Sequence, residues 1–222
     1  MKNFEDLVKN KNVVIVGPAH HLTGSNSGKI IDSYDVVVKI NGLLYNKNSK
    51  DYGERIDVLT TNLEFIRNNQ LTDDLLIKKG IKFILCKRIF NNETQIPFKV
   101  LRTPDHKLFE NSPAPLNGIN AINEIINNKP KELFITGFDF YTSGKWFTEN
   151  YYPTSPEYTG SGNPKWDFKF VDSSASQSNS LHRIEVDFMF LADLCKTNRN
   201  IKLDDKLKDL FNLYEKQKSL RK

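Results

Sequence analysis

The sequence predicts an α/β fold: a single domain with a mainly parallel, Rossmann-like sheet flanked by helices. Short runs rich in Val and Ile alternate along the chain with segments whose apolar residues recur at helical spacing. This alternation is typical of strand, helix, strand units in a parallel sheet. The chain has 222 residues, of which 38% are hydrophobic and 27% charged, and these values suit one sizeable soluble domain. We therefore expect residues 1–222 to form one domain.

The first strand, helix, strand unit organises the chain. Residues 13–16 (VVIV) form an apolar run that ends abruptly at Gly17-Pro18, and residues 35–40 form a second run after a short amphipathic segment that reaches Ile31. We expect two strands joined by a helix. In open α/β folds the loop after the first strand lies at the carboxyl edge of the sheet, where phosphate groups often meet a helix N-terminus. A nucleotide is therefore the first ligand to consider.

Two common phosphate-binding motifs are absent from this loop. A dinucleotide-binding fingerprint needs Gly-x-Gly-x-x-Gly directly after the strand, but Gly17 lacks the second glycine. A P-loop ends in Gly-Lys followed by Ser or Thr, but Lys29 precedes Ile30. The sequence therefore argues against a nicotinamide oxidoreductase and against a P-loop NTPase.

The other elements follow from apolar spacing and from capping residues. Further strands are expected at residues 56–60, 81–86, 98–101 and 133–136. Helices are expected at residues 4–9, at 63–79 with a break at Asn68-Asn69 and a C-cap at Gly80, from Asn117 as N-cap to Lys129-Pro130, from Ser180 as N-cap, and over 203–214. Arg55, which lies between Glu54 and Asp57, is expected in a structural ion pair.

Composition and charge argue against several classes of protein. The formal net charge of +5 suits an anionic ligand, but the lysines are scattered, so we expect a solvated surface and no nucleic-acid binding. No window approaches the roughly 20 apolar residues that span a bilayer, and the amino terminus lacks a signal-peptide core. Cys86 and Cys195 lie in apolar patterns, so two buried thiols are expected instead of a disulfide. These features predict a soluble, cytoplasmic protein without a transmembrane segment.

Residues 141–180 contain few signals of regular structure but many aromatic side chains. A loop of this length within a compact domain is usually functional or disordered, and the aromatic content argues against disorder. Rings that stack on sugar faces would make the segment an acceptor-binding lid. An aromatic cluster packed beneath the loop explains the composition equally well.

The amino-terminal unit resembles the long motif of animal-type sialyltransferases, glycosyltransferase family 29. That motif reads as a strand, Gly-Asn-Ser-Gly, a leucine, a glycine-rich turn, Ile-Asp-x-x-Asp and a strand that ends in Arg-x-Asn. The residues in register without a gap are Gly17, Leu22, Gly24, Gly28, Ile31, Asp32, Asp35, Lys39 and Asn41. Pro18 and Ala19 replace the family's Asn and Ser, which removes side-chain donors expected to contact the cytidine monophosphate (CMP) donor. Asn41 remains available for that contact.

A second segment, residues 111–138, resembles the family's short motif, which reads Pro-Ser-Thr-Gly, a helix and a strand that ends in Tyr-Gly-Phe. The retained residues are Pro115, Gly118, Gly137 and Phe138, whereas Leu116 and Asn117 replace Ser and Thr. The resemblance implies that Gly118 permits close approach to the donor, while free amides at the helix start hold its phosphate. An ordinary capped core helix is the alternative interpretation of this segment taken alone.

The family's remaining motifs correspond to residues nearer the carboxyl terminus. A His-Tyr-Tyr element, whose histidine is thought to steady the leaving phosphate, corresponds to Asn150-Tyr151-Tyr152, so Tyr152 or Tyr151 could donate that hydrogen bond instead. The last motif, His, four residues and Glu, corresponds to His182 and Asp187, with Glu185 as an alternative acid. The resemblance thus implies that His182 is the base for the acceptor hydroxyl. At a helix start, the positive helix end would keep its imidazole neutral.

The resemblance implies an enzyme that moves an acidic sugar, such as sialic acid, from a CMP-sugar donor to a hydroxyl of a glycan or glycoconjugate by inverting displacement. It also implies a GT-A-like variant of the nucleotide-sugar transferase fold. The implied donor-binding residues are Gly17, Pro18, Ala19, His20, Asn41, Asn117, Gly118, Gly137 and Phe138, with His21 as a further candidate.

Neither a metal ion nor a cofactor is expected, because no Asp-x-Asp motif appears near a strand end and the family acts without an essential metal. Two alternatives remain open from the sequence. One is a transferase for another nucleotide sugar, including the capsule-polysaccharide type. The other is a non-catalytic descendant that binds a nucleotide or a glycan.

Overall fold

The computed structural model describes residues 3–87, 100–102, 115–142 and 184–219. Within these residues one seven-stranded sheet has the order β5-β4-β3-β2-β1-β6-β7. Its strands are β1 (Asn12–Val16), β2 (Val36–Ile40), β3 (Val58–Asn62), β4 (Phe83–Lys87), β5 (Val100–Arg102), β6 (Glu132–Thr136) and β7 (Ile201–Leu203). Every neighbouring pair of these strands is parallel. The predicted α/β class with a mainly parallel sheet is confirmed.

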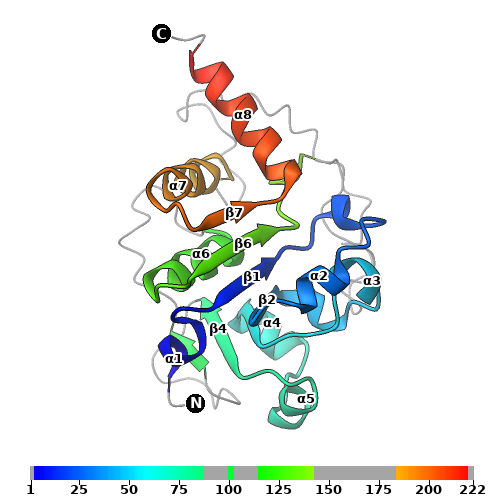
Figure 1. Cartoon of the computed structure of the whole chain (residues 1–222). Coiled ribbons are helices and arrows are strands. Elements are labelled where there is room, and N and C mark those ends of the chain that lie inside the picture. Colours follow the sequence, from blue (N-terminus) through cyan, green and yellow to red (C-terminus); the bar gives the residue numbers. More distant parts are fainter. Residues whose placement is uncertain (1–2, 88–99, 103–114, 143–183, 220–222) are drawn as a thin grey trace.

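Helices cover both faces of this sheet (Figure 1). They are α1 (Phe4–Val8), α2 (Gly28–Asp32), α3 (Ser49–Tyr52), α4 (Leu63–Asn68), α5 (Asp73–Lys78), α6 (Asn117–Asn127), α7 (Ile184–Thr197) and α8 (Asp205–Ser219), together with the 3-10 turns η1 (His20–Leu22) and η2 (Asn41–Tyr45). In β1, Val13 and Ile15 pack into a core with residues of α6, α7 and α8, whereas Val14 and Val16 pack with residues of α2 and α3. A strand buried on both faces explains the continuous apolar run.

The expected helix over residues 63–79 is two helices, as its internal break indicated. α4 ends at Asn68, Gln70 adopts a left-handed backbone with φ of 47°, and the Thr72 side chain then caps α5 by accepting from the N–H of Leu75. Gly80, with φ of 74°, ends the segment before β4. Its lack of a Cβ makes that turn accessible without steric penalty.

One expected element was wrong. Leu203 was assigned to the final helix, but it lies in β7, which pairs with β6, and α8 begins only at Asp205. A three-residue edge strand carries too short a pattern to be distinguished from a helix start. Its pairing with β6 is a tertiary contact and is not encoded in local spacing. The remaining strands shift by only one or two residues from their expected bounds.

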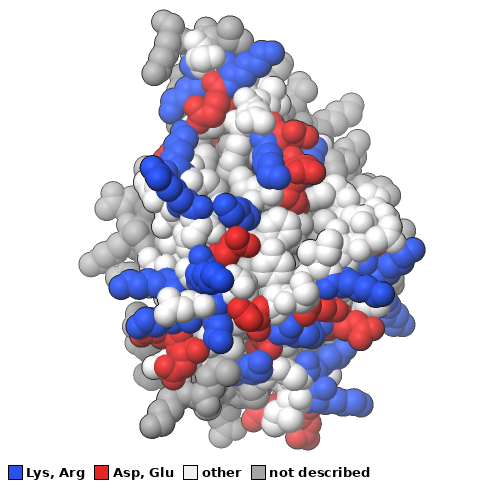
Figure 2. Space-filling view, in the orientation of Figure 1, with Lys and Arg blue, Asp and Glu red and all other residues white. Residues whose placement is uncertain are grey.

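The surface agrees with the expected scatter of charge. On the face that Figure 2 shows, basic and acidic side chains are interspersed, and neither sign forms a continuous block. Cys86 and Cys195 form no disulfide, Cys86 is buried, and burial raises the pKa of each thiol to about 12. In the part of the chain that the structure describes, no helix is both long and apolar enough to cross a membrane. Of the expected lid over residues 141–180, only Tyr141 and Thr142 lie among the described residues.

Candidate active site

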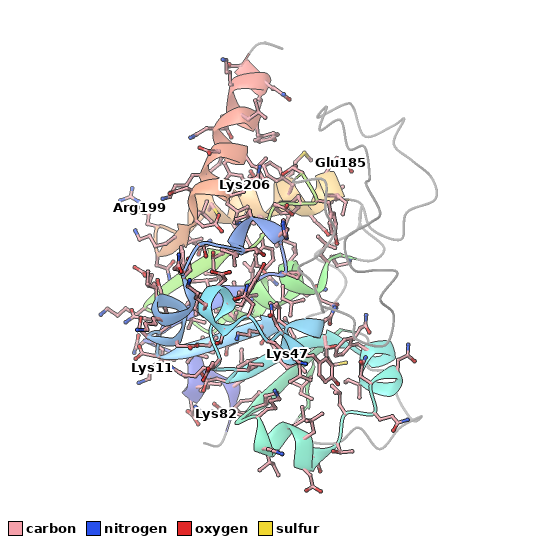
Figure 3. The ribbon with its side chains drawn as sticks, turned by 90° about the vertical axis from the view of Figure 1, so that its right-hand side faces the viewer. Lys11, Lys47, Lys82, Glu185, Arg199 and Lys206 are labelled. Atoms are coloured by element: carbon pink, nitrogen blue, oxygen red, sulfur yellow. The ribbon has the colours of Figure 1, made fainter. Side chains whose placement is uncertain are left out.

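The strand order reverses between β1 and β6, so the loops after these two strands diverge to opposite sides of the sheet. Such a switch point is where open α/β sheets bind ligands. Gly17 follows β1 and Gly137 follows β6, and the two loops are joined by hydrogen bonds from Gly17 N to Thr136 O (2.8 Å) and from Ala19 N to Gly137 O (2.9 Å). A Cβ on Gly17 would overlap the Gly137 carbonyl. Both glycines therefore serve a close backbone crossing at this edge. Figure 3 shows the molecule with its side chains, turned by 90° from the view of Figure 1.

The loop after β1 is held by buried polar partners. The Ala19 carbonyl accepts a hydrogen bond from the Tyr52 hydroxyl at 2.9 Å. The Asp51 carboxylate accepts from Gly24 N at 2.7 Å and from Asn26 N at 2.8 Å. These contacts order the backbone of the loop before any ligand arrives, although Pro18 and Ala19 lack the family's side-chain donors. Pro18 and His20 are only partly buried, so part of each side chain is open to a ligand.

Asn41 and Asn117 meet at the same edge. Asn41 follows β2 in a left-handed conformation with φ of 40° and is 8% exposed. Its Oδ1 accepts a hydrogen bond from Asn117 Nδ2 at 3.1 Å, and the hydroxyl of Thr60, the middle residue of β3, donates to the Asn117 carbonyl at 3.3 Å. Left-handed asparagine at a strand end is uncommon and clusters at functional sites. The end of β2 and the start of α6 thus meet through two amide side chains, with Thr60 of β3 beside them.

The structure corrects the role expected for Asn117 as a helix cap. The N-cap of α6 is Leu116, which makes no side-chain cap, and Asn117 is the first helical residue. Its side chain turns to Asn41, while the N–H of Leu116 donates to Asp187 Oδ2 at 2.8 Å. A partner from α7 therefore caps this helix start, and the asparagine is available for the contact across the sheet.

Gly118 was expected to let the nucleotide donor approach closely, but in the structure the groups that lie close to it are protein side chains. A Cβ at this position would overlap the Phe138 ring and lie 2.9 Å from Ile40 Cδ1. Phe138 is buried in the core that α6 shares with β6. Gly118 and Phe138 consequently set how closely α6 lies against the end of β6, and this fixes the position of the helix start.

The predicted catalytic residues are only partly described. Asp187 lies in the first turn of α7 and is fully buried, with its carboxylate on the start of α6. His182 and Tyr152 lie outside the described residues, as does Tyr151. The expected roles of His182 and Tyr152, and the expected pairing of Asp187 with His182, therefore stay predictions.

Several residues of the long motif stabilise the scaffold. Asp32 accepts hydrogen bonds from the backbone N–H groups of Glu54 (2.8 Å) and Arg55 (3.0 Å), and Asp35 accepts from Asn12 N (2.8 Å). These carboxylates fasten α2 and the start of β2 to neighbouring segments. Both carboxylates therefore have a structural role in this chain.

Two basic side chains in this part of the chain are also structural. Lys39 is 2% exposed, its ammonium group donates to the Gly53 carbonyl at 2.6 Å, and burial lowers its pKa to about 8 despite the nearby Asp32. Arg55 contacts Asp57 at 2.7 Å, which confirms the expected ion pair, and it also donates to backbone carbonyls at the end of α2. Neither is a candidate for the ligand site.

Asp204 is a residue of this region that sequence reasoning missed. It lies between β7 and α8, and its carboxylate contacts His21 Nε2 at 3.0 Å, the Thr136 hydroxyl at 2.9 Å and Gly137 N at 2.9 Å. Burial raises the pKa of Asp204, but these hydrogen bonds outweigh it and lower the pKa below its usual value. The available signal was an Asp before a helical pattern, which is typical of an N-cap. Placing Leu203 inside the helix concealed it.

A metal site is not evident in the part of the chain that the structure describes. No group of three or more His, Cys, Asp or Glu side chains there could hold a metal ion. The side chains described at the carboxyl edge are the amides of Asn41 and Asn117, the imidazoles of His20 and His21, and the carboxylates of Asp187 and Asp204. Both carboxylates already accept hydrogen bonds from backbone N–H groups. This is a set of hydrogen-bond donors and acceptors suited to a polar organic ligand.

Comparison with protein families gives the arrangement its context. Residues 5–94 match the model of glycosyltransferase family 29 (sialyltransferase). This part of the chain, less than half of its 222 residues, is similar to glycosyltransferase family 29. The match contains the long motif and β1 to β4, but it ends before the short motif and α6. A search of curated protein sequences finds no match.

Solved structures show the same fold. A mammalian sialyltransferase in complex with Gal-beta-1-3GalNAc-ortho-nitrophenol has a TM-score of 0.54 and 16% identity, covering 90% of this chain and 71% of that one. The sialyltransferase CstII from Campylobacter jejuni, in complex with a substrate analogue, cytidine-5'-monophosphate, has a TM-score of 0.52 and 14% identity, covering 90% and 83%. The resemblance to family 29 and the GT-A-like sheet are confirmed. Family and fold together support a glycosyltransferase function.

Proposed function

We propose that this protein transfers an acidic sugar, sialic acid or a relative, from a CMP-sugar to a glycan hydroxyl by inverting displacement. The observation that carries the proposal is the hydrogen bond between Asn41 and Asn117. It joins the long and short motifs, 76 residues apart in the chain, at the edge of the sheet where nucleotides bind. The CMP found in CstII supports a cytidine nucleotide as the ligand.

The two amides form a unit with a defined polarity. Because Asn41 Oδ1 already accepts from Asn117 Nδ2, the Asn41 amide offers its nitrogen to a ligand as a donor. Asn117 offers its oxygen as an acceptor. A donor beside an acceptor matches the ribose hydroxyls or the polar edge of a pyrimidine. In this assignment, the amide pair replaces contacts that the family makes through side chains at the positions of Pro18 and Ala19.

The start of α6 would hold the donor phosphate. The N–H groups of Asn117 and Gly118 lie in the first helical turn and have no intrahelical acceptor. The helix dipole adds about 0.3 to 1 kcal/mol to anion binding at an exposed helix start. The N–H of Leu116 is excluded from this role because Asp187 accepts it. The proposal therefore assigns the phosphate to the amides of Asn117 and Gly118.

Catalysis would use the residues that follow the short motif. His182 would take the proton of the acceptor hydroxyl, and general-base help of this kind contributes roughly 100- to 10,000-fold. Tyr152 or Tyr151 would donate to the leaving phosphate. α7 begins two residues after His182, and the Asp187 contact holds that first turn beside the start of α6. The aromatic segment 141–180 would bind the acceptor as a lid, and no metal ion or cofactor would take part.

The proposal is tested by calorimetric binding of CMP, UMP, GMP and AMP, followed by turnover of CMP-sialic acid with a panel of glycans. We expect selective CMP binding, about tenfold weaker in Asn41→Ala through loss of the amide donor. His182→Ala should keep CMP binding and lose turnover by roughly 100-fold or more. Asn127→Ala is the matched control, because Asn127 is exposed at the opposite end of α6. Turnover should persist in the presence of a chelator.

Three outcomes would contradict the proposal. Preference for another nucleotide would identify a different nucleotide-sugar transferase. Selective CMP binding without turnover of any CMP-sugar would indicate a non-catalytic descendant. Turnover that a chelator abolishes and manganese restores would exclude the metal-independent mechanism.

A further inference from the structure

Asp204 links four segments through one carboxylate. Oδ1 accepts from Leu207 N at 2.9 Å, which caps the start of α8. Oδ2 accepts from Gly137 N and the Thr136 hydroxyl at the end of β6, both at 2.9 Å, and lies 3.0 Å from His21 Nε2. The side chain is 13% exposed. In a site this sheltered from water, hydrogen bonds to a carboxylate are among the stronger polar contacts of a protein.

His21 is the member of this group that belongs to the loop after β1. Its side chain is 19% exposed, and Asp204 is its hydrogen-bond partner through Nε2, which donates as the carboxylate accepts. Nδ1 is buried, and within the described residues it has no hydrogen-bond partner. The ring therefore makes one directional contact, and that contact is with a residue 183 positions away in the chain.

The contact between His21 and Asp204 anchors the loop after β1 from the side opposite to Tyr52. The Ala19 carbonyl is held from the α3 side by the Tyr52 hydroxyl, and Ala19 N is held by Gly137. The histidine turn η1 is held from the other side of the switch point by Asp204. Without His21, Asp204 keeps its other three donors, so β6 and α8 stay fixed while the loop loses one anchor.

We propose that His21 and Asp204 form a positioning pair that holds the loop after β1 in the shape that binds the nucleotide donor. The inference deepens the proposed function, on which its nucleotide-binding part rests. Pro18 and Ala19 have no side-chain hydrogen-bond donor. The contacts of this turn with the nucleotide would therefore come from its backbone and from His20. Backbone contacts need a defined loop shape, and a pre-ordered loop binds more tightly because less conformational freedom is lost on binding. His21 acts through the loop and is a positioning residue, not a catalytic one.

The test compares two amide substitutions of different reach. In His21→Gln the amide nitrogen can occupy the place of Nε2, whereas in His21→Asn it occupies the place of Nδ1 and falls short of Asp204. We expect His21→Asn to weaken CMP binding about tenfold, the effect of one charge-assisted hydrogen bond, and His21→Gln to restore most of the affinity. Asp205→Asn is the control, because Asp205 is the adjacent carboxylate and is 94% exposed.

A second measurement is independent of the nucleotide. Backbone hydrogen exchange of the full chain is followed by mass spectrometry over residues 17–26 without ligand. His21→Asn should exchange about tenfold faster in this loop than the unchanged protein, with β6 and α8 unaffected, and His21→Gln should behave like the unchanged protein.

The two measurements separate the inference from the function on which it rests. If the unchanged protein binds no cytidine nucleotide, the proposed function fails, and hydrogen exchange alone decides the role of the pair. The inference is overturned if His21→Asn leaves loop exchange unchanged. It is also overturned if His21→Asn lowers the melting temperature but binds CMP as tightly as the unchanged protein, since the pair would then serve only stability.

Discussion

At the scale of single residues, the glycines of the two motifs differ in what they approach. A side chain at Gly17 would meet the backbone carbonyl of Gly137, which cannot move without breaking the β1–β6 crossing. A side chain at Gly118 would meet the rings and methyl groups of Phe138 and Ile40, which can shift. The same residue type in two motifs therefore tolerates change to different degrees.

We expect Gly17→Ala to lower the free energy of unfolding by about 3 kcal/mol or more, and Gly118→Ala to lower it by about 1 kcal/mol. The physical reason is that overpacking against a fixed carbonyl has no relief, whereas side chains can repack. Urea unfolding monitored by circular dichroism measures both values. Gly24→Ala is the comparison for backbone strain alone, because φ is +85° there and no atom lies within 4 Å of the added Cβ. A Gly118→Ala loss equal to that of Gly17→Ala would refute this account.

Residue types alone could not assign these roles. Gly17, Gly118, Asn41 and Asn117 were all expected at the donor site from motif spacing, and the structure shows that Asn41 and Asn117 are hydrogen-bonded to each other. The structure also shows that Gly118 makes room for Phe138. The reason is that a glycine in a motif indicates only that another group packs closely against its backbone. Which group lies close depends on residues from other parts of the chain.

At the scale of elements, the contact between α6 and α7 is the one most relevant to function. The fully buried Asp187 carboxylate in α7 caps α6 at Leu116, so the two helix starts are held together. The resemblance to the family's last motif implies that the acidic residue at this position pairs with His182. In the structure, Asp187 Oδ2 has a different role: it accepts a hydrogen bond from Leu116 N and so holds the start of α6, the helix proposed to bind the phosphate.

Substitution at Asp187 distinguishes these two tasks. Asp187→Asn keeps an acceptor for Leu116 N, so we expect stability close to that of the unchanged protein and turnover reduced by no more than about threefold. Asp187→Leu leaves that buried N–H without an acceptor, and we expect a loss of about 1–3 kcal/mol in unfolding free energy together with a loss of turnover. Thermal unfolding and initial rates with CMP-sialic acid measure both effects. Stable Asp187→Asn protein with turnover abolished would show that the charge itself is needed, as a partner of His182.

Element boundaries were predictable where local signals agreed. β1, β2 and β6 were expected within one or two residues, because apolar runs that end in turn residues mark buried parallel strands. β7 was missed, because three residues at an edge depend on their partner strand for definition. Asn117 was wrongly expected as a cap, because the acceptor that caps the helix start, Asp187, lies 71 residues from its partner Leu116 in the chain.

At the scale of the whole molecule, buried carboxylates join distant segments. Asp57 accepts from Lys82 Nζ at 2.6 Å, from Arg55 at 2.7 Å and from Val37 N at 2.9 Å. Burial raises its pKa, but these partners outweigh burial and lower the pKa below its usual value. Asp204 behaves in the same way across the other half of the sheet. The folded state is therefore stabilised by ionised Asp57 and Asp204.

The sign of the pH dependence follows from these lowered pKa values. A carboxyl whose pKa is lower in the folded state stabilises the fold above its unfolded pKa, near 3.9, and loses that contribution as the pH falls through its folded pKa. We expect the free energy of unfolding to decrease steeply as the pH falls below about 4. Asp57→Asn should be less stable at pH 7 by about 2 kcal/mol and should show a shallower acid dependence. Urea unfolding at several pH values measures both. Asp193→Asn, a change at an exposed carboxylate, should alter neither, and identical acid slopes for Asp57→Asn and the unchanged protein would contradict the assignment.

The sequence by itself determined the α/β class, the long-motif register and the turn residues that end β1 and β6. These features arise from interactions between residues close in the chain, such as apolar periodicity and glycine conformation. Only the tertiary structure decided which polar groups meet: Asn41 with Asn117, Leu116 with Asp187, and His21 with Asp204. Buried polar groups must find partners, but local sequence does not say which of many donors and acceptors the fold will bring within reach. The order of the strands makes that choice, because it sets which loops share an edge of the sheet.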